Sequence, residues 1–235
     1  MHTVFTMPKY HHIEGFLLSL ADRFEREEGT LIYDGRNQLR EFNINGIMIV
    51  VKSFAIPSII NRIAYGFIRS SKAQRSCEYA KMLIEHGISS PEPVGYLTER
   101  KGLLFNHSYY ACLKSENPYN FNDIVAKGFA DRNEHLRAIA RTTAKMHECG
   151  YLHTDYSAGN ILTGKKADGT IGVEIIDLNR IRFKRIGLEM GCKNFERLPM
   201  NDEIIDVIGR TYAEARHFDA QQCINAIKAT YRYKI

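Results

Sequence analysis

The spacing of apolar residues changes at the segment "KSENPYN", residues 114–120, and this change constrains the fold more than any other feature. Before it, the chain is a series of short strand-like runs. After it, helical spacing dominates. The segment itself is polar and contains a proline, which is typical of a linker. A strand-rich half followed by a helix-rich half predicts an α+β fold with two lobes, residues 1–114 and 115–235, that together form one domain.

The first half contains two hairpin signals. The dipeptides Asp34-Gly35 and Asn45-Gly46 separate three apolar runs, and both positions of such tight turns favour positive φ. We therefore expect a three-stranded antiparallel meander whose third strand, within "IMIVVKSF", ends at Lys52. A helix should follow and stop at Gly87, and two more strands should run from 94 to 113 around a Lys-Gly turn. The apolar residues at helical spacing are Ala73, Cys77, Ala80, Leu83 and Ile84.

The second half predicts a long helix capped by Asn133 and ended by Gly150. The polar loop "LHTDYSAGNIL", residues 152–162, comes next, and then a hairpin with Asp168-Gly169 at its turn. Two further helices are expected from Asn201 onward. The apolar side of the long helix should comprise Leu136, Ile139, Ala140, Thr143 and Met146.

Composition narrows the class of protein. The net charge of +5 fits an anionic substrate such as a nucleotide, or an anionic surface. The 5 cysteines form no CxxC pair, so we expect reduced thiols in a cytoplasmic protein and no structural zinc. The first residues show no signal-peptide pattern, and no apolar run approaches the roughly 20 residues of a membrane helix.

Five side chains occur in the order that ATP-dependent phosphoryl transfer requires. The reaction needs a cation on the phosphates, hard oxygen ligands for magnesium, and a carboxylate that orients the attacking hydroxyl. Each residue alone has an ordinary interpretation, such as a solvated lysine, a surface glutamate or a turn-capping aspartate. Their shared order is far more specific than any one of them. The five are Lys52, Glu78, Asp155, Asn160 and Asp177.

These residues resemble the protein-kinase-like superfamily and, more narrowly, the bacterial lipopolysaccharide kinase family. The resemblance rests on "HTDYSAGNIL", "VEIIDLNRIRF" and "FIRSSKAQRSCEYAKMLIEHGISSPEPVGY", and covers roughly residues 30–185. It implies a small antiparallel-sheet N-lobe, a mainly helical C-lobe, and ATP with Mg²⁺. The acceptor implied is a glycolipid, the lipopolysaccharide core precursor, phosphorylated on a hydroxyl of Kdo or heptose.

The resemblance also implies roles for individual residues. Asp155 would be the catalytic base, and His153 would support its loop. Asn160 and Asp177 would bind magnesium, while Lys52 would contact the phosphates and pair with Glu78. Adenine would lie near residues 110–113, with Ala111 and Leu113 among its contacts.

Two departures from the protein-kinase pattern concern the substrates. No GxGxxG is present, and "YDGRNQ" offers only Gly35 to cover the phosphates. The chain after Asp177 contains no Ala-Pro-Glu segment and is short for a peptide-docking lobe. This favours a small or glycolipid acceptor over a protein.

Two basic stretches suggest peripheral contact with an anionic membrane at the inner leaflet, against the alternative of a solvated face. No nucleic-acid-binding motif is present, so nucleic acid is not expected. Two other functions stay open: a phosphotransferase acting on a small molecule or protein, and a silent pseudokinase that binds a partner. The stretches comprise Arg62, Arg69, Lys72 and Arg75, and Arg180, Arg182, Lys184, Arg185, Lys193 and Arg197.

Overall fold

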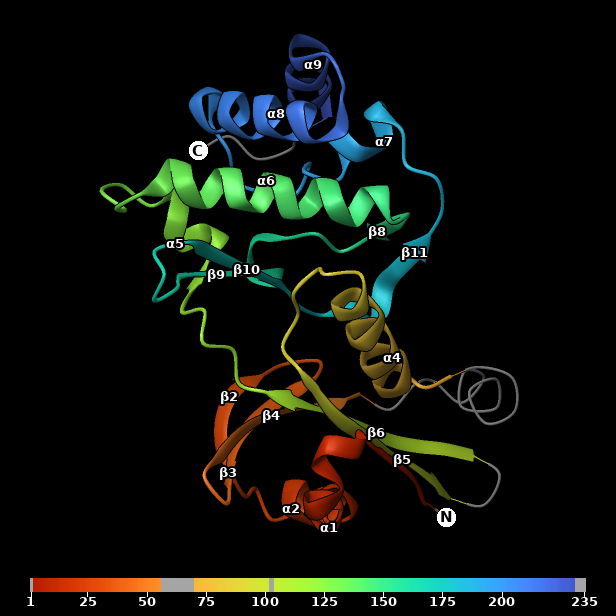
Figure 1. Cartoon of the computed structure of the whole chain (residues 1–235). Coiled ribbons are helices and arrows are strands. Elements are labelled where there is room, and N and C mark those ends of the chain that lie inside the picture. Colours follow the sequence, from red (N-terminus) through yellow and green to blue (C-terminus); the bar gives the residue numbers. More distant parts are fainter. Residues whose placement is uncertain (1, 56–69, 102–103, 231–235) are drawn as a thin grey trace. The chain divides into compact units, whose positions relative to one another are not determined.

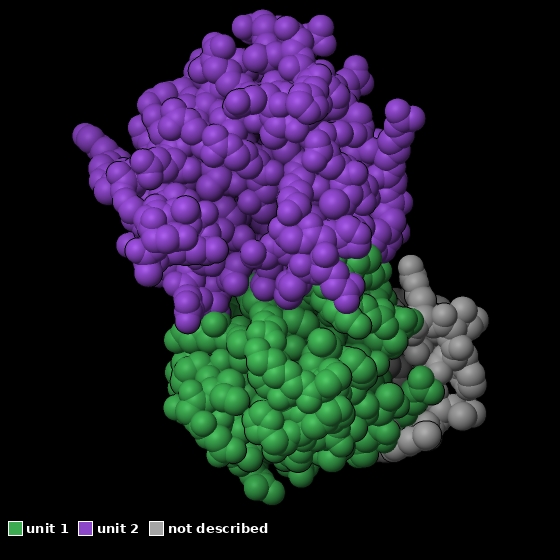
Figure 2. Space-filling view, viewed as in Figure 1, with its two compact units in different colours: residues 1–82, 91–114 green, residues 83–90, 115–235 purple. Residues whose placement is uncertain are grey.

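A computed structural model describes residues 2–55, 70–101 and 104–230 (Figure 1). The chain forms two compact units (Figure 2). Unit 1 comprises Met1–Met82 and Pro91–Lys114, and unit 2 comprises Leu83–Ser90 and Ser115–Ile235. Residues 83–90 thus group with unit 2, although the sequence analysis assigned them to the first lobe.

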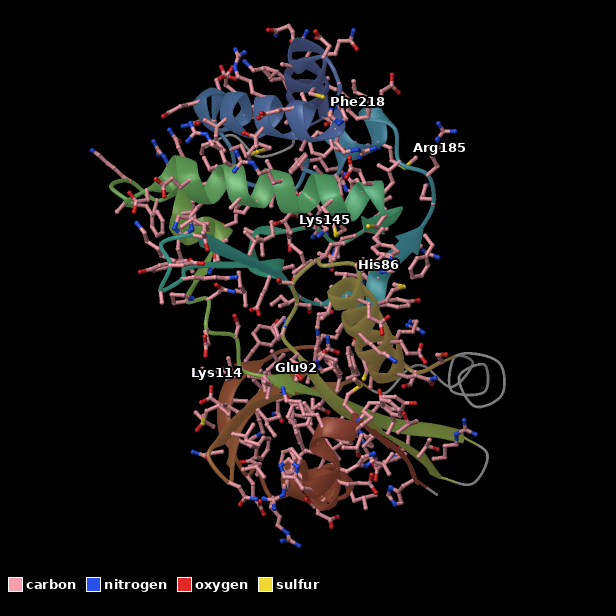
Figure 3. The ribbon with its side chains drawn as sticks, viewed as in Figure 1. His86, Glu92, Lys114, Lys145, Arg185 and Phe218 are labelled. Atoms are coloured by element: carbon pink, nitrogen blue, oxygen red, sulfur yellow. The ribbon has the colours of Figure 1, made fainter. Side chains whose placement is uncertain are left out.

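Contacts within unit 2 explain that grouping. The Ile175 amide donates to the Ser89 carbonyl at 3.0 Å. Lys145 donates through Nζ to the Gly87 carbonyl at 2.9 Å, and the Tyr151 hydroxyl lies 3.2 Å from Nδ1 of His86 (Figure 3). Residues 83–90 are therefore fastened by hydrogen bonds to segments that lie more than fifty residues further along the chain.

Unit 1 contains an antiparallel sheet in the order β1-β5-β6-β4-β3-β2. Its middle strands are long and apolar on one face, as expected of strands that pack on a core. The strands are β1 (His2–Thr6), β2 (Thr30–Asp34), β3 (Gln38–Ile44), β4 (Ile47–Phe54), β5 (Pro93–Lys101) and β6 (Leu104–Leu113).

The two predicted hairpins form with different turns. Asn45 and Gly46 have φ of 54° and 85° between paired Ile44 and Ile47, which is the expected two-residue turn. At the other hairpin Asp34 pairs with Gln38, so the turn is longer, and Gly35 does not adopt positive φ. The expectation of positive φ at Asp34-Gly35 is therefore wrong, because the extra turn residues remove the need for it.

Helices cover one face of this sheet, and the sequence analysis did not predict them. They are η1 (Pro8–Ile13), α1 (Glu14–Leu18) and α2 (Leu20–Glu25). Each is too short for a clear helical period. Leu17 and Leu20 are fully buried in a cluster with Ile49, Val51 and other inward residues of the sheet. This burial stabilises helices that would be marginal in isolation.

Among the described residues, unit 1 also contains most of α4 (Lys72–Glu85), which continues past Met82 into unit 2. Gly87 ends it with φ of 68°, as predicted. Ala73, Cys77, Ala80 and Leu83 are buried as expected, whereas Ile84 is 40% exposed. Assigning Ile84 to the buried face was wrong, because it lies at the edge of the apolar stripe.

Unit 2 is built on α6 (Arg132–Glu148), which packs against α8 (Asp202–Arg216). All five predicted core residues of α6 are fully buried, and Gly150 follows it with φ of 78°. The predicted cap was wrong. Asp131 occupies the N-cap, its carbonyl accepts the first helical hydrogen bonds, and Asn133 lies inside the helix.

The remaining elements of unit 2 are short strands and flanking helices. They are α5 (Phe121–Val125), α7 (Leu188–Lys193), α9 (Ala220–Thr230), β7 (Tyr119–Asn120), β8 (Tyr151–His153), β9 (Ile161–Lys165), β10 (Ile171–Ile175), β11 (Ile181–Phe183), η2 (Ala158–Asn160) and η3 (Leu178–Arg180). The β9–β10 hairpin has Gly169 at φ of 84° in its turn, as predicted, and α8 and α9 are the two expected tail helices.

All five cysteines are free thiols. Within the described ranges no helix has the length and apolar character needed to cross a membrane. Two predicted features involve residues outside the described ranges. Arg62 and Arg69 of the first basic stretch lie wholly outside them, and the Lys-Gly turn at 101–102 lies partly outside them.

Candidate active site

The polar loop of unit 2 starts from a buried histidine. His153 ends β8 and is 0% exposed. Its Nε2 lies 3.1 Å from the Ile176 carbonyl, and its Nδ1 accepts from the Asp155 amide at 3.2 Å. Because Nδ1 accepts and Nε2 faces a carbonyl, we assign the proton to Nε2. Burial lowers the pKa of His153, so the ring is neutral at pH 7.

The turn between Asp155 and Asn160 is closed by its own hydrogen bonds. The Asp155 carbonyl accepts from Nδ2 of Asn160 at 2.8 Å and from the Ser157 amide at 2.9 Å. The Asn160 carbonyl in turn accepts from the Ile176 amide at 3.0 Å. This last bond ties the loop to the segment that carries Asp177.

Asp177 follows β10 and adopts a left-handed backbone conformation, with φ of 57°. A left-handed aspartate is uncommon outside turns and functional sites. Its Oδ1 accepts from Nδ2 of Asn179 at 2.6 Å. Asn160 and Asp177 therefore lie on two backbone segments joined by a hydrogen bond, and each presents a side-chain oxygen.

Two arginines contact the carboxylate of Asp155. Nη1 of Arg197 is paired with Oδ1, and Nη1 of Arg180 lies 3.3 Å from Oδ2. The Asp155 side chain is 19% exposed. Both arginines belong to the second basic stretch, so two of its cations form ion pairs instead of a wholly solvated face. Sequence reasoning gave neither arginine this role, since Arg197 is forty-two positions from its partner.

A buried polar network contacts the start of the polar loop at His153. Nδ2 of Asn194 donates to the His153 carbonyl at 2.9 Å, and Oδ1 of Asn194 lies 2.9 Å from Nε2 of His147. Nδ1 of His147 lies 2.8 Å from the Tyr212 hydroxyl, to which Arg216 donates at 3.0 Å. Burial lowers the pKa of His147 to about 4. No sequence motif marks this network, because its members lie in α6, at the end of α7 and in α8.

In unit 1, one row of residues across the sheet contains Lys52. Lys52 pairs with Tyr110, and Tyr110 pairs with Tyr96, so these three side chains project from one face. Burial raises the pKa of Tyr96, and the nearby Glu78 carboxylate raises it further. Glu78 thus lies on α4 close to the face that carries Lys52. The pairing of Lys52 with Glu78 stays a prediction.

The two residues expected beside adenine point the other way. Ala111 pairs with Val51, and Leu113 pairs with Ile49, and these side chains belong to the core on the helix-covered face. The Leu113 amide also donates to the Glu92 carbonyl at 2.9 Å. Contact of Ala111 or Leu113 with a nucleotide would therefore involve backbone atoms; that role stays a prediction.

The oxygen donors of unit 2 suit magnesium. The described residues hold no group of three or more His, Cys, Asp or Glu side chains arranged for a metal ion. Magnesium commonly takes one or two protein oxygens and fills its octahedron with phosphates and water. Asn160, whose amide nitrogen is engaged with the Asp155 carbonyl, has Oδ1 left to serve as an oxygen ligand, and Asp177 supplies a carboxylate.

Comparison with known proteins places this geometry in a class. The fold is protein-kinase-like. A solved structure, WaaP in complex with acyl carrier protein, matches with a TM-score of 0.62 over 97% of this chain and 97% of that chain, at 15% identity. A search of curated proteins found no match.

The family follows from the sequence. The model of the lipopolysaccharide kinase (Kdo/WaaP) family matches residues 60–221. The chain belongs to this family, and the fold predicted from the sequence resemblance is confirmed. It is a kinase, a phosphotransferase whose acceptor is a sugar hydroxyl of the lipopolysaccharide core.

Proposed function

We propose that the chain transfers the γ-phosphoryl group of ATP to a hydroxyl of the Kdo sugar in a lipopolysaccharide core precursor. The observation that carries this proposal is the braced loop of unit 2. There the neutral ring of His153 and the side chain of Asn160 hold the backbone on both sides of the Asp155 carboxylate.

In the proposed step, the acceptor hydroxyl donates a hydrogen bond to the Asp155 carboxylate. Its oxygen attacks the γ-phosphorus, the bond from that phosphorus to the β–γ bridging oxygen breaks, and ADP leaves. The hydroxyl proton passes to Asp155. The protein contributes mainly by positioning the reactants and by stabilising charge.

The remaining residues bind the nucleotide. Lys52 contacts the α and β phosphates and is oriented by Glu78, and the backbone of residues 111–113 lies beside adenine. Asn160 and Asp177 hold Mg²⁺, which neutralises charge on the phosphates when bound. The row of Lys52, Tyr110 and Tyr96 supports this assignment, since it places Lys52 on the sheet face to which Glu78 is close.

The location we propose is cytoplasmic and peripheral to the inner leaflet, where a core precursor attached to lipid A is accessible. Arg182 and Phe183 of β11 are both exposed, and Phe183 is 51% exposed. A cation beside an exposed aromatic ring suits the interface of an anionic membrane.

The test is ADP release with ATP and Mg²⁺, in the presence and absence of purified Kdo-containing lipid A precursor. We expect release that depends on the precursor, and loss of most turnover in Asp155→Ala with the fold retained by circular dichroism. Because a general base and hydroxyl-orienting group contributes about 10²–10⁴-fold, the loss should fall in that range.

Three other outcomes would separate the alternatives. Full activity in Asp155→Ala would refute the catalytic assignment. Turnover on a neutral heptose acceptor but not on Kdo would show that the acceptor sugar is heptose and not Kdo. Nucleotide binding without turnover on either sugar would favour a pseudokinase or a different acceptor.

A further inference from the structure

The carboxylate of Asp155 is contacted on both oxygens by arginines. Arg197 contacts Oδ1, and Arg180 contacts Oδ2 at 3.3 Å. An acceptor hydroxyl must hydrogen-bond one of these two oxygens before Asp155 can orient it. Each carboxylate oxygen can accept more than one hydrogen bond, so an acceptor hydroxyl that reaches Asp155 lies beside at least one of these guanidinium groups.

The two arginines have anchored backbones and solvent-accessible ends. The Arg180 carbonyl accepts from the Thr154 hydroxyl at 2.8 Å, which fixes it beside the loop. Arg197 lies between Phe195 and Leu198, both fully buried. Yet the side chains of Arg180 and Arg197 are 52% and 43% exposed. Ion pairs this exposed are weak, so a new partner can displace them at low cost.

The three side chains of Asp155, Arg180 and Arg197 together carry an excess of positive charge. One carboxylate and two guanidinium groups sum to one positive charge, so this surface favours an anionic acceptor. A guanidinium group binds a carboxylate through two parallel hydrogen bonds, which is a strong and directional contact. An acidic sugar supplies such a carboxylate close to its own hydroxyls, whereas a neutral heptose does not.

We propose that Arg180 and Arg197 are specificity-determining residues that bind the carboxylate of an acidic acceptor sugar beside Asp155. This inference rests on the proposed function and deepens it, because it makes the acceptor an acidic sugar. Without the acceptor, the arginines occupy the carboxylate. With it, they hold the sugar's own carboxylate beside the base.

The test compares two acceptors that differ only in that carboxylate: Kdo-containing lipid A precursor, and the same precursor with its Kdo carboxyl converted to the methyl ester. Both keep the same phosphates. Binding to the full chain is measured in detergent without nucleotide. We expect the wild type to bind the acid roughly twofold to fivefold more tightly than the ester, as an ion pair with a half-exposed arginine gives.

The variants Arg197→Gln and Arg180→Gln should bind the acid more weakly and bind the ester almost unchanged. Arg141→Gln removes the same charge from an exposed position on α6 and should retain the full preference. The comparison of acid and ester on the wild type needs no variant, so a folding defect in either variant leaves the proposal falsifiable.

Equal binding of acid and ester by the wild type would overturn the inference. So would a loss on both acceptors to the same extent in the arginine variants, which would indicate a lipid A phosphate as the anion bound. ADP release is followed separately. A preference for the acid without turnover would support the inference on acceptor binding while contradicting the proposed phosphate transfer to Kdo.

Discussion

Two buried histidines stabilise the polar loop of unit 2 while their rings are uncharged. Nδ1 of His153 accepts from the Asp155 amide, and Nδ1 of His147 faces the Tyr212 hydroxyl, which already accepts from Arg216. A proton on Nδ1 of His153 would replace an accepted hydrogen bond with a repulsive contact, and a proton on Nδ1 of His147 would remove the acceptor of the Tyr212 hydroxyl proton. Burial lowers the pKa of both rings, in agreement with these partners.

This gives a pH dependence of stability with a definite sign. The pKa of His147 falls from 6.5 to about 4 on folding, so the unfolded chain binds the proton more readily. Stability from the neutral ring is present above pH 6.5 and is lost as pH falls toward 4. Between pH 7.5 and 5 we expect His147 to account for a loss of about 2 kcal/mol in unfolding free energy, measured by denaturant titration.

A matched pair of variants isolates this contribution. His147→Gln should be less stable at pH 7.5 and should show a smaller pH dependence. His12→Gln, at an exposed position of unit 1, should keep the wild-type dependence. An unchanged dependence in His147→Gln would show that the protonation-linked stability resides elsewhere.

At the scale of elements, two asparagines near helix starts behave differently. Asn201 caps α8, because its Oδ1 accepts from the Ile204 amide at 3.0 Å. Asn133 lies inside α6 and caps nothing. Asn201→Ala should therefore lower the unfolding free energy by about 1 kcal/mol. Asn133→Ala should leave it unchanged or raise it slightly, because alanine favours helix interiors.

Thermal or denaturant unfolding of the two variants checks this contrast. A loss at Asn133 as large as that at Asn201 would contradict the assignment of the caps. The sequence alone favoured Asn133, since asparagine before an apolar period is a common helix start. It could not show that the helix extends further back, to an aspartate that uses its carbonyl instead of its side chain.

Elements with a long period or a local turn signal could be predicted. The five buried positions of α6, the Asn45-Gly46 turn and the glycines that end α4 and α6 follow from spacing and backbone geometry. The helices from 8 to 25 could not be, because they are short and are stabilised by contact with strands far along the chain. The exposure of Ile84 likewise depends on its neighbours in space.

The candidate site divides in the same way. Asp155, Asn160 and Asp177 lie where short motifs placed them, on a loop and after a strand; their roles stay predictions. The groups that contact them do not follow from any motif. Arg197, Asn194 and His147 come from separate elements, and no local pattern of residue types marks them.

At the scale of the whole molecule, the net charge of +5 is concentrated in part around β11. Each cation near an anionic surface contributes about 1 kcal/mol at most, and salt reduces it. We therefore expect binding to vesicles that contain anionic lipid, weaker binding at high salt, and little binding to neutral vesicles. Sedimentation with vesicles of each composition measures this.

A variant with Arg182, Lys184 and Arg185 changed to Gln tests whether the basic residues around β11 form the membrane-binding surface. It should lose most of the salt-sensitive binding, because all three residues are exposed. They are not the arginines paired with Asp155, so the carboxylate of Asp155 keeps its contacts. Equal partitioning of the wild type to neutral and anionic vesicles would rule out this membrane contact.

The pairing of the first strand with the fifth has a consequence for biosynthesis. β1 lies against β5 with His2 opposite Glu99, and β4 lies against β6, which ends at Leu113. A ribosome adds about 5–20 residues per second, so roughly 5–20 s pass between the synthesis of Leu17 and Leu20 and the synthesis of the last strand of the sheet. During that interval the nascent chain exposes the apolar side of its first helices, which makes it a substrate for chaperones that bind unfolded segments.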